Sequence, residues 1–315
     1  MKLLYIARRV ALALPTLLLV AIAVFTLIHL IPGDPAQLML GDGADDAALA
    51  LLRTQLGLDQ PLTLQFAHWL GRVLQGDFGH SIVNGLAVLP LVLERFQVSA
   101  TIVLSAVALA ALIAVPAGLI AAWKQNQALD IVIVGGATLL LSIPSFWLGL
   151  LLLLMFGLKL GWLPVVGYVP LGESLSQGLL FVLMPIVTLV MIEIGVLTRM
   201  SRASAIEVLR LEYVTHARAK GVPEWQVLLR HVLPNAFAPT LTLIGVVLGN
   251  LLGGVAVLET VFTLPGLGRL MVDAIYARDY PVVQGVMLFT AFIYVFINLL
   301  IDLCYPFFDP RVAAQ

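Results

Sequence analysis

The chain has 315 residues, of which 61% are hydrophobic and only 11% are charged, and its formal net charge is −1. Soluble domains carry about 25% charged residues, so this composition, with a mean hydropathy of +1.05, excludes a soluble globular protein. The balanced charge gives no reason to expect a nucleic-acid partner.

Six stretches are long and apolar enough to cross a bilayer, which takes about 20 helical residues. Lipid offers no hydrogen bonds to a peptide group, so each span must be a helix. The alternating pattern of β-barrel strands is absent. The sequence therefore predicts an all-α polytopic membrane protein with six transmembrane helices, over residues 10–31, 98–122, 131–158, 179–199, 236–258 and 284–305.

The first span follows Lys2, Arg8 and Arg9, as the apolar core of a signal peptide follows its basic residues. However, its apolar run is longer than the roughly 7–15 residues of a signal peptide, and further spans follow. We therefore expect a retained helix.

Cationic residues are distributed unequally between the segments that join the spans. With a cytoplasmic N-terminus, the cytoplasmic segments hold eleven of the 17 Lys and Arg residues, and the outer segments hold six. Positive charge favours the cytoplasmic side. The distribution predicts an N-in, C-in topology.

Chemistry-bearing clusters are missing from the sequence. Cys304 is the only cysteine, so no intrachain disulfide can form. The five histidines show no metal-ligand spacing, and the Gly-x4-Gly-Lys-Ser/Thr loop that cradles nucleotide phosphates does not occur. We therefore expect no catalytic residue, metal or cofactor in this chain.

Residues 32–96 form a long, mostly polar insert on the outer side of the predicted topology. It opens with the turn signal Pro32-Gly33-Asp34-Pro35. Two amphipathic patterns then predict helices over Ala44–Leu56 and Pro61–Gln75, with Pro61 suited to a first helical position. Such an insert is either a docking surface or a cap over helix ends, and its composition does not separate the two.

Small residues recur every four positions in two spans. Such ladders let another backbone approach closely, either within the chain or from a second membrane subunit. The residues are Ala106, Ala110, Ala114, Gly118 and Ala122 in the second span and Gly245, Gly249 and Gly253 in the fifth.

Glu193 lies inside the fourth span, where an ionisable group is costly and needs a partner or a cavity. It either lines a translocation path or is hydrogen-bonded within the helix bundle. Asn250, Ser142 and Ser145 are further polar candidates for such a path. Proline can kink a helix, because it removes a backbone donor and clashes one turn back. The prolines placed to do so within the spans are Pro116, Pro144 and Pro185.

The segment VTHARAKGVPEWQVLLRHVLPNA, residues 214–236, is predicted to form a helical elbow. Ser201–Lys220 consists largely of good helix formers, and Gly221 fits a left-handed C-cap position. Pro223 can begin a second helix that runs to about Leu233. An ordinary positive-inside loop would explain the charge of this segment, but not a short rigid turn suited to a groove in another protein.

The elbow resembles the EAA loop of ABC importer permeases, whose pattern is Glu-Ala-Ala, three residues, Gly, nine residues, then Ile-x-Leu-Pro. Ala217, Gly221, Leu233 and Pro234 match this pattern, whereas Thr215, His216 and His231 replace its Glu, first Ala and Ile. ARAKG (217–221) resembles the dipeptide, oligopeptide and nickel branch. Further stretches of that branch are IPGDP (31–35), LGLDQPL (56–62), GDFGHS (76–81), LPGLGRL (264–270), RDYPVVQG (278–285) and DPR (309–311).

The resemblance implies a bacterial inner-membrane permease that forms half of a translocation pathway for di- or oligopeptides. It implies a second homologous permease subunit, two ATPase subunits that bind ATP and Mg, and an extracytoplasmic solute-binding protein. The alternatives are a nickel, metal-chelate or glutathione importer and, more distantly, a stand-alone secondary transporter or a structural assembly factor. The implied division is 1–95 for the first helix and insert, 96–305 for the permease domain with coupling loop 200–235, and 306–315 for a cytoplasmic tail.

The resemblance also assigns roles to residues. The residues implied in ATPase coupling are Thr215, His216, Ala217, Arg218, Ala219, Lys220, Gly221, Val222, Glu224, Leu233 and Pro234. Those implied in docking of the binding protein are Asp34, Asp59, Asp77, Arg278 and Asp279.

Overall fold

The computed structural model describes the chain except residues 1, 31–36, 38–44, 57 and 309–315. The turn predicted at 32–35, including Asp34, and the DPR stretch therefore lie outside the described residues. The described part is helical, apart from turns and one isolated antiparallel bridge between His80 and Ala87. This confirms the all-α class.

Five helices in the described part are long and apolar enough to span a membrane. They are α1 (Lys2–Leu30), α5 (Val88–Trp123), α8 (Leu175–Leu209), a continuous helix over Glu224–Gly253 that ends within α11 (Leu233–Gly254), and α14 (Tyr280–Phe308). They match five of the six predicted spans.

The span predicted over 131–158 is not one straight helix. It consists of α6 (Ala128–Leu141) and a second segment made of α7 (Ser145–Leu152) and the π-helix η1 (Leu153–Lys159), bent by 93°. Pro144 causes the break, because it has no N–H for the helix ladder and disfavours helical backbone at the preceding Ile143. Pro116 and Pro185, in contrast, lie within the uninterrupted helices α5 and α8.

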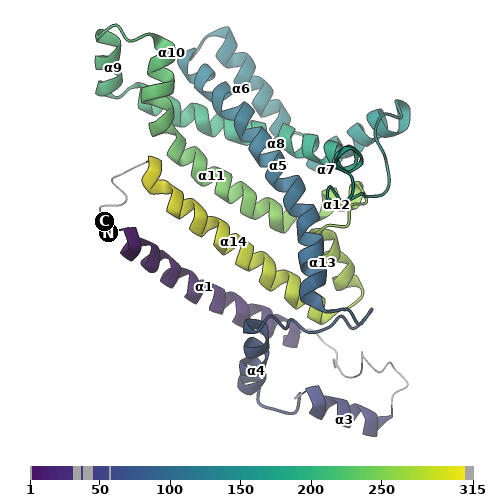
Figure 1. Cartoon of the computed structure of the whole chain (residues 1–315). Helices are drawn as coiled ribbons and strands as arrows, with labels where there is room; N and C mark the ends of the chain where they lie inside the picture. Colours follow the sequence, from purple (N-terminus) through teal and green to yellow (C-terminus); the bar gives the residue numbers. More distant parts are fainter. Residues whose placement is uncertain (1, 31–36, 38–44, 57, 309–315) are drawn as a thin grey trace.

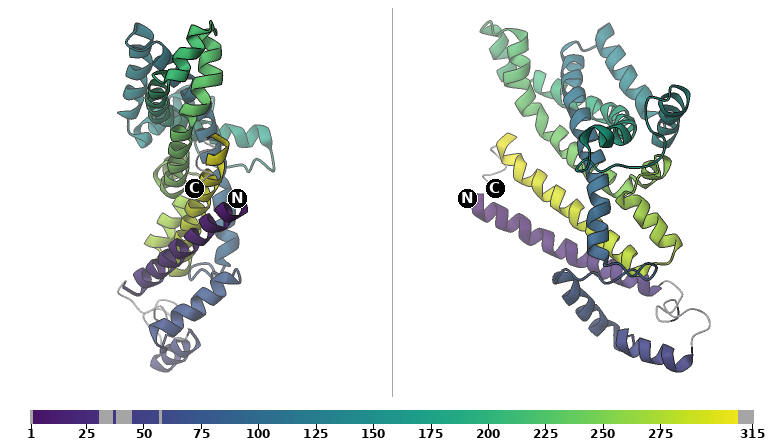
Figure 2. Two further views of the ribbon diagram at one scale, coloured as in Figure 1. Left: turned by 90° about the vertical axis from the view of Figure 1, so that its left-hand side faces the viewer. Right: turned by 45° about the vertical axis from the view of Figure 1, so that its right-hand side comes forward.

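The insert contains the two predicted helices, with slightly shorter bounds. These are α3 (Asp46–Leu56) and α4 (Leu62–Leu74), with Pro61 at the N-cap of α4. They lie at one end of the molecule, and α9 (Glu212–Ala219) and α10 (Glu224–Gln226) lie at the opposite end (Figures 1 and 2). The first turns of α1 and the last turns of α14 lie near each other (Figure 1).

Both small-residue ladders pack within the chain. All five members of the α5 ladder are buried, and a side chain added at Gly118 would lie 2.7 Å from the Ser201 Cβ and 2.8 Å from the Arg202 amide nitrogen of α8. A side chain at Gly245 would lie 2.6 Å from Ile301 of α14. The ladders therefore allow close α5–α8 and α11–α14 packing, and the alternative of a second-subunit contact is not needed to explain them.

The main hydrophobic core joins α5, α8 and α11. Helix α1 packs at the edge against α14, where the Arg9 guanidinium lies 2.9 Å from the Asp302 carboxylate. After α11 the chain forms α12 (Ala256–Val261) and the amphipathic α13 (Leu267–Tyr276) before α14 begins.

Candidate functional site: the helical elbow and the motifs at the opposite end

The elbow turns at Gly221, which has φ of +77°, a left-handed backbone favoured by glycine. The Val222 N–H donates to the Ala217 carbonyl at 3.2 Å, and the Gly221 N–H donates to the Arg218 carbonyl at 2.9 Å. These two bonds are the Schellman motif that ends a helix and satisfies its last carbonyls. The predicted C-cap role of Gly221 is confirmed.

A salt bridge joins the two helices of the elbow across the turn at Gly221. The Arg218 guanidinium donates two hydrogen bonds to the Glu224 carboxylate, at 2.8 and 3.1 Å. A bidentate pair sets both distance and orientation, so the helices on either side of Gly221 are held together by backbone and side chain alike.

Two boundaries of the elbow differ from the predicted ones. The helix expected over Ser201–Lys220 is interrupted, because α8 ends at Leu209 and α9 begins at Glu212. This break turns Val214 and Ala217 toward a buried cluster with Ala205 and Val208 of α8. The interruption of the helix in favour of this apolar burial is a tertiary effect that helix propensity does not contain.

The second helix does not end near Leu233. It continues through the π-helix η2 (Val227–Val232) into α11. Pro234 has no N–H to donate to the Arg230 carbonyl, and a π-helical turn relieves such a position. The His231 carbonyl accepts from the Asn235 side chain at 2.9 Å and from the Tyr213 hydroxyl at 3.3 Å.

The predicted coupling residues separate into two groups. Ala217 is buried and packs on the bundle, and Val222, Glu224 and Leu233 are partly buried. The exposed residues are Thr215, His216, Arg218, Ala219, Lys220, Gly221 and Pro234. Ala217 is therefore a packing residue, and the outward face of α9 consists of its exposed neighbours.

Sequence reasoning missed four large exposed side chains on the same elbow. Their exposed fractions are 47% for Leu211, 40% for Tyr213, 59% for Trp225 and 52% for Leu229. Apolar and aromatic residues that interrupt a charged loop are a signal that was available in the sequence. Together with the cations they form a mixed surface typical of protein interfaces.

The four candidates for a translocation path differ in their exposure. Glu193 is buried at 7% exposure, and its Oε2 atom has no hydrogen-bond partner among the described residues. Asn250 and Ser142 are exposed, and Ser145 is partly buried at the start of α7. Ser142 and Ser145 flank the bend between α6 and α7.

The stretches 76–81 and 278–285 meet at the end of the molecule opposite the elbow. Asp279 is buried at 4% exposure; its carboxylate accepts from the Ser81 hydroxyl and, at 3.1 Å, from the Ile82 N–H. This carboxylate ties the end of the insert to the start of α14, so Asp279 does not offer its side chain to a docking partner. Of the other docking candidates, Asp59, Asp77 and Arg278 are exposed.

The stretch 264–270 forms the N-terminus of α13, which is capped by side chains from two other helices. The Ser99 hydroxyl of α5 accepts from the Leu267 N–H at 2.8 Å, and the Glu259 carboxylate of α12 accepts from the Arg269 N–H at 2.8 Å. A carboxylate at a helix N-terminus is also favoured by the helix dipole. Glu259 leaves no space for a side chain at Gly266, which explains the glycine there.

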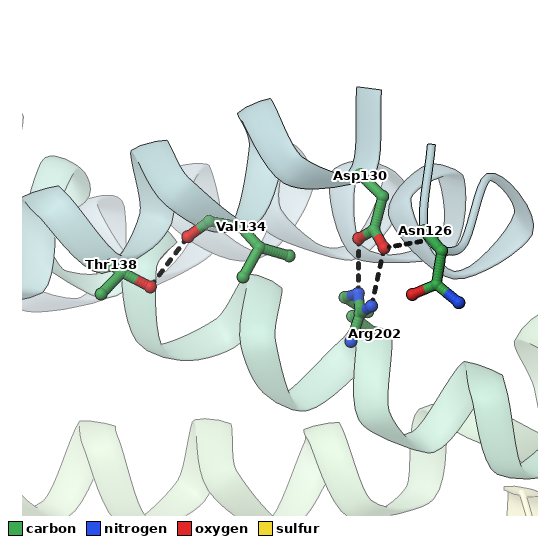
Figure 3. A network of polar contacts seen from close by, with 5 residues as sticks. All are labelled: Asn126, Asp130, Val134, Thr138 and Arg202. Carbon is green, nitrogen blue, oxygen red and sulfur yellow. Dashed lines mark hydrogen bonds and ion pairs between the residues drawn. The ribbon is translucent and has the colours of Figure 1, made fainter. Parts of the chain in front are cut away.

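An ion pair between a partly buried arginine and a buried aspartate, which the sequence did not reveal, joins α6 to α8 (Figure 3). The Arg202 guanidinium donates to both carboxylate oxygens of Asp130, at 2.6 and 2.7 Å, and the Asn126 N–H donates to the same carboxylate at 2.9 Å. The sequence did offer one signal for this pair, because the acidic residue Asp130 directly precedes the apolar span predicted over 131–158. The described residues hold no group of three or more His, Cys, Asp or Glu that could bind a metal ion.

Comparison with known proteins identifies the class. Residues 114–314 match the family "Binding-protein-dependent transport system inner membrane component", and residues 2–107 match its N-terminal counterpart, "Binding-prot-dependent transport system membrane comp, N-term". The chain belongs to this family. It is a multi-pass inner-membrane permease component of an ABC importer, which confirms the resemblance.

Three relatives align along nearly their whole length, at 98% coverage of both chains. A putative peptide transport system permease protein of Brucella suis is 42% identical over 307 residues. A probable peptide ABC transporter permease protein of Sinorhizobium fredii is 38% identical over 308 residues. The glutathione transport system permease protein GsiC of Salmonella choleraesuis is 42% identical over 308 residues.

Proposed function

We propose that this permease imports di- or oligopeptides, and that its elbow receives the motion of ATPase subunits that bind below it. Family membership places the chain in a binding-protein-dependent system with other subunits. Relatives described as peptide permeases support the substrate class. Glutathione is the second candidate, because GsiC is as similar as the Brucella relative.

The observation that carries the coupling role is the rigidity of the elbow. Its turn combines a Schellman motif, a bidentate salt bridge and buried anchors at Val214 and Ala217. A floppy loop would lose an imposed displacement as conformational entropy, whereas a packed elbow moves with the helices that hold it. Its exposed apolar and cationic residues offer a surface for a partner.

The remaining parts of the assembly follow from this role. We propose two ATPase subunits that bind ATP and Mg, a second homologous permease, and a solute-binding protein on the opposite side, with both termini cytoplasmic. The exposed residues Asp59, Asp77 and Arg278 are then available for docking. Asn250 is exposed on a membrane helix, where lipid contact is costly, so it faces the pathway or the second permease.

The test compares two glycines with the same backbone geometry. Gly221 and Gly161 have φ of +77° and +65°, and a side chain at either would meet nothing within 4 Å. In the complete transporter reconstituted with its binding protein, Gly221→Asp should abolish substrate-stimulated ATP hydrolysis, and Gly161→Asp should preserve it. Equal stimulation in both variants would contradict the coupling role.

The substrate is tested with the same preparation. Uptake of a labelled dipeptide should be reduced by unlabelled di- and tripeptides in excess. Uptake of labelled glutathione without uptake of the labelled dipeptide would replace the peptide assignment with the glutathione one.

A further inference from the structure

We propose that Asp130 and Arg202 are a pair of positioning residues that make α6 move with the elbow, so that a displacement of the elbow reaches the bend between α6 and α7. This inference rests on the proposed coupling function. It starts from the geometry in Figure 3, in which the guanidinium faces the carboxylate edge-on with two hydrogen bonds of 2.6 and 2.7 Å.

The pair is built as a defined contact between two helices. The Asp130 side chain is 4% exposed and that of Arg202 is 24% exposed. The Asn126 N–H donates a third hydrogen bond to the carboxylate at 2.9 Å, and Asn126 itself has φ of +63°. Removing Arg202 would leave the buried Asp130 carboxylate without its charge partner, which is strongly unfavourable. The first turn of α6 is therefore held at one distance and one orientation to α8.

Arg202 is connected to the elbow through the packing of α8 against α9. Arg202 lies on the same helix as Ala205 and Val208, and these two residues share a buried cluster with Val214 and Ala217 of α9. Close-packed interiors transmit displacement because they have few voids to absorb it. A push on α9 is thus delivered to the segment of α8 that carries Arg202.

The pair is connected to the bend between α6 and α7 through the packing of α8 against α6. A side chain added at Gly195 of α8 would lie 2.6 Å from the Ala137 carbonyl oxygen and 2.7 Å from Leu141 of α6. The two helices therefore stay in contact up to the residue before Ser142. Beyond the bend, Gly149 of α7 packs against Phe262, because a Cβ added to this glycine would lie 3.1 Å from the Phe262 ring. Phe262 directly follows α12, the helix that carries Glu259.

The alternative to a positioning role is an ion pair that only stabilises the fold. The two roles differ in a measurable ratio, the number of substrate molecules transported per ATP hydrolysed. If the pair has a positioning role, its removal lowers this ratio in transporters that are still folded. A purely stabilising role changes the yield of folded transporter and leaves the ratio intact.

The experiment uses the complete transporter in liposomes with the variants Asp130→Asn, Arg202→Gln and the double variant. The double variant removes both charges, so it keeps the fold even where a single variant leaves one charge unpaired. We expect all three to hydrolyse ATP but to transport roughly 2- to 30-fold fewer substrate molecules per ATP. The double variant should be no worse than the more severe single variant, as for two residues that act as a unit.

Arg9→Gln is the matched control, because it removes the cation of another interhelical ion pair, between α1 and α14. It should keep the wild-type ratio. A wild-type ratio in the double variant would overturn the positioning role, whatever the loss in yield. Failure of the proposed coupling function gives a different result, since Gly221→Asp would then keep normal stimulation of ATP hydrolysis.

Discussion

The Ser99 hydroxyl of α5 donates a hydrogen bond of 2.5 Å to the Glu259 carboxylate of α12, 160 residues further along the chain. Through this contact a transmembrane helix and a short helix together cap the N-terminus of α13. Both residues are 1% exposed, so neither can replace its partner with water.

Ser99→Ala should destabilise the protein by about 1–3 kcal/mol, because it leaves a Glu259 oxygen and the Leu267 N–H without their buried partner. Thermal unfolding of the purified protein in detergent measures this. Thr101→Ala is the control, since Thr101 is only partly buried and its hydroxyl donates to the Gln97 carbonyl of its own helix. Equal effects of the two substitutions would contradict the capping role of Ser99.

Gly118→Ala should destabilise the protein by about 1–3 kcal/mol through overpacking. The added Cβ would lie 2.8 Å from the Thr198 carbonyl oxygen and from the Arg202 nitrogen, and backbone atoms cannot rotate away. Gly136→Ala serves as the comparison, because nothing lies within 4 Å of that position in α6. It should be neutral or stabilise the helix by up to about 1 kcal/mol. Relative to the wild type, Gly118→Ala should lower the urea or thermal unfolding midpoint, whereas Gly136→Ala should leave it unchanged or raise it.

Two alanines of α9 should respond differently to the same substitution. Ala217→Leu inserts volume into a buried cluster and should lower the free energy of unfolding by about 1–3 kcal/mol. Ala219→Leu adds the same volume on the exposed face of the elbow. It should leave thermal unfolding nearly unchanged and reduce co-purification of the ATPase subunits. Normal ATPase binding by Ala219→Leu would place the contact elsewhere.

Single cysteines in a Cys304→Ser background test the orientation. Asp77 and Lys220 are both exposed. Asp77 follows α4 closely and Lys220 is the C-cap of α9, and these two helices lie at opposite ends of the structure (Figure 1). In intact spheroplasts a membrane-impermeant maleimide should label Asp77→Cys but not Lys220→Cys. In permeabilised cells the maleimide should label both variants. Labelling of Lys220→Cys but not of Asp77→Cys in intact spheroplasts would contradict the N-in, C-in topology.

Local features of the elbow and insert were predictable from the sequence. Gly221 ends α9 as expected, because a left-handed C-cap depends on residues within one turn. The amphipathic patterns of 44–56 and 61–75 form α3 and α4 with boundaries shifted by one or two residues. The break of α8 before Glu212 was not predictable, because it depends on burial of Val214 and Ala217 against other helices.

The sequence by itself determined the class of protein, five of the spans and the rigid turn, because hydropathy and helix capping are set by residues close together in the chain. Only the tertiary structure decided that Asp130 pairs with Arg202, that Asp279 is buried against Ser81, and that both small-residue ladders face partners in the same chain. A buried polar or small residue takes its role from whatever packs against it. In this protein those partners lie from about 40 to almost 200 residues away in sequence, beyond the reach of any local pattern.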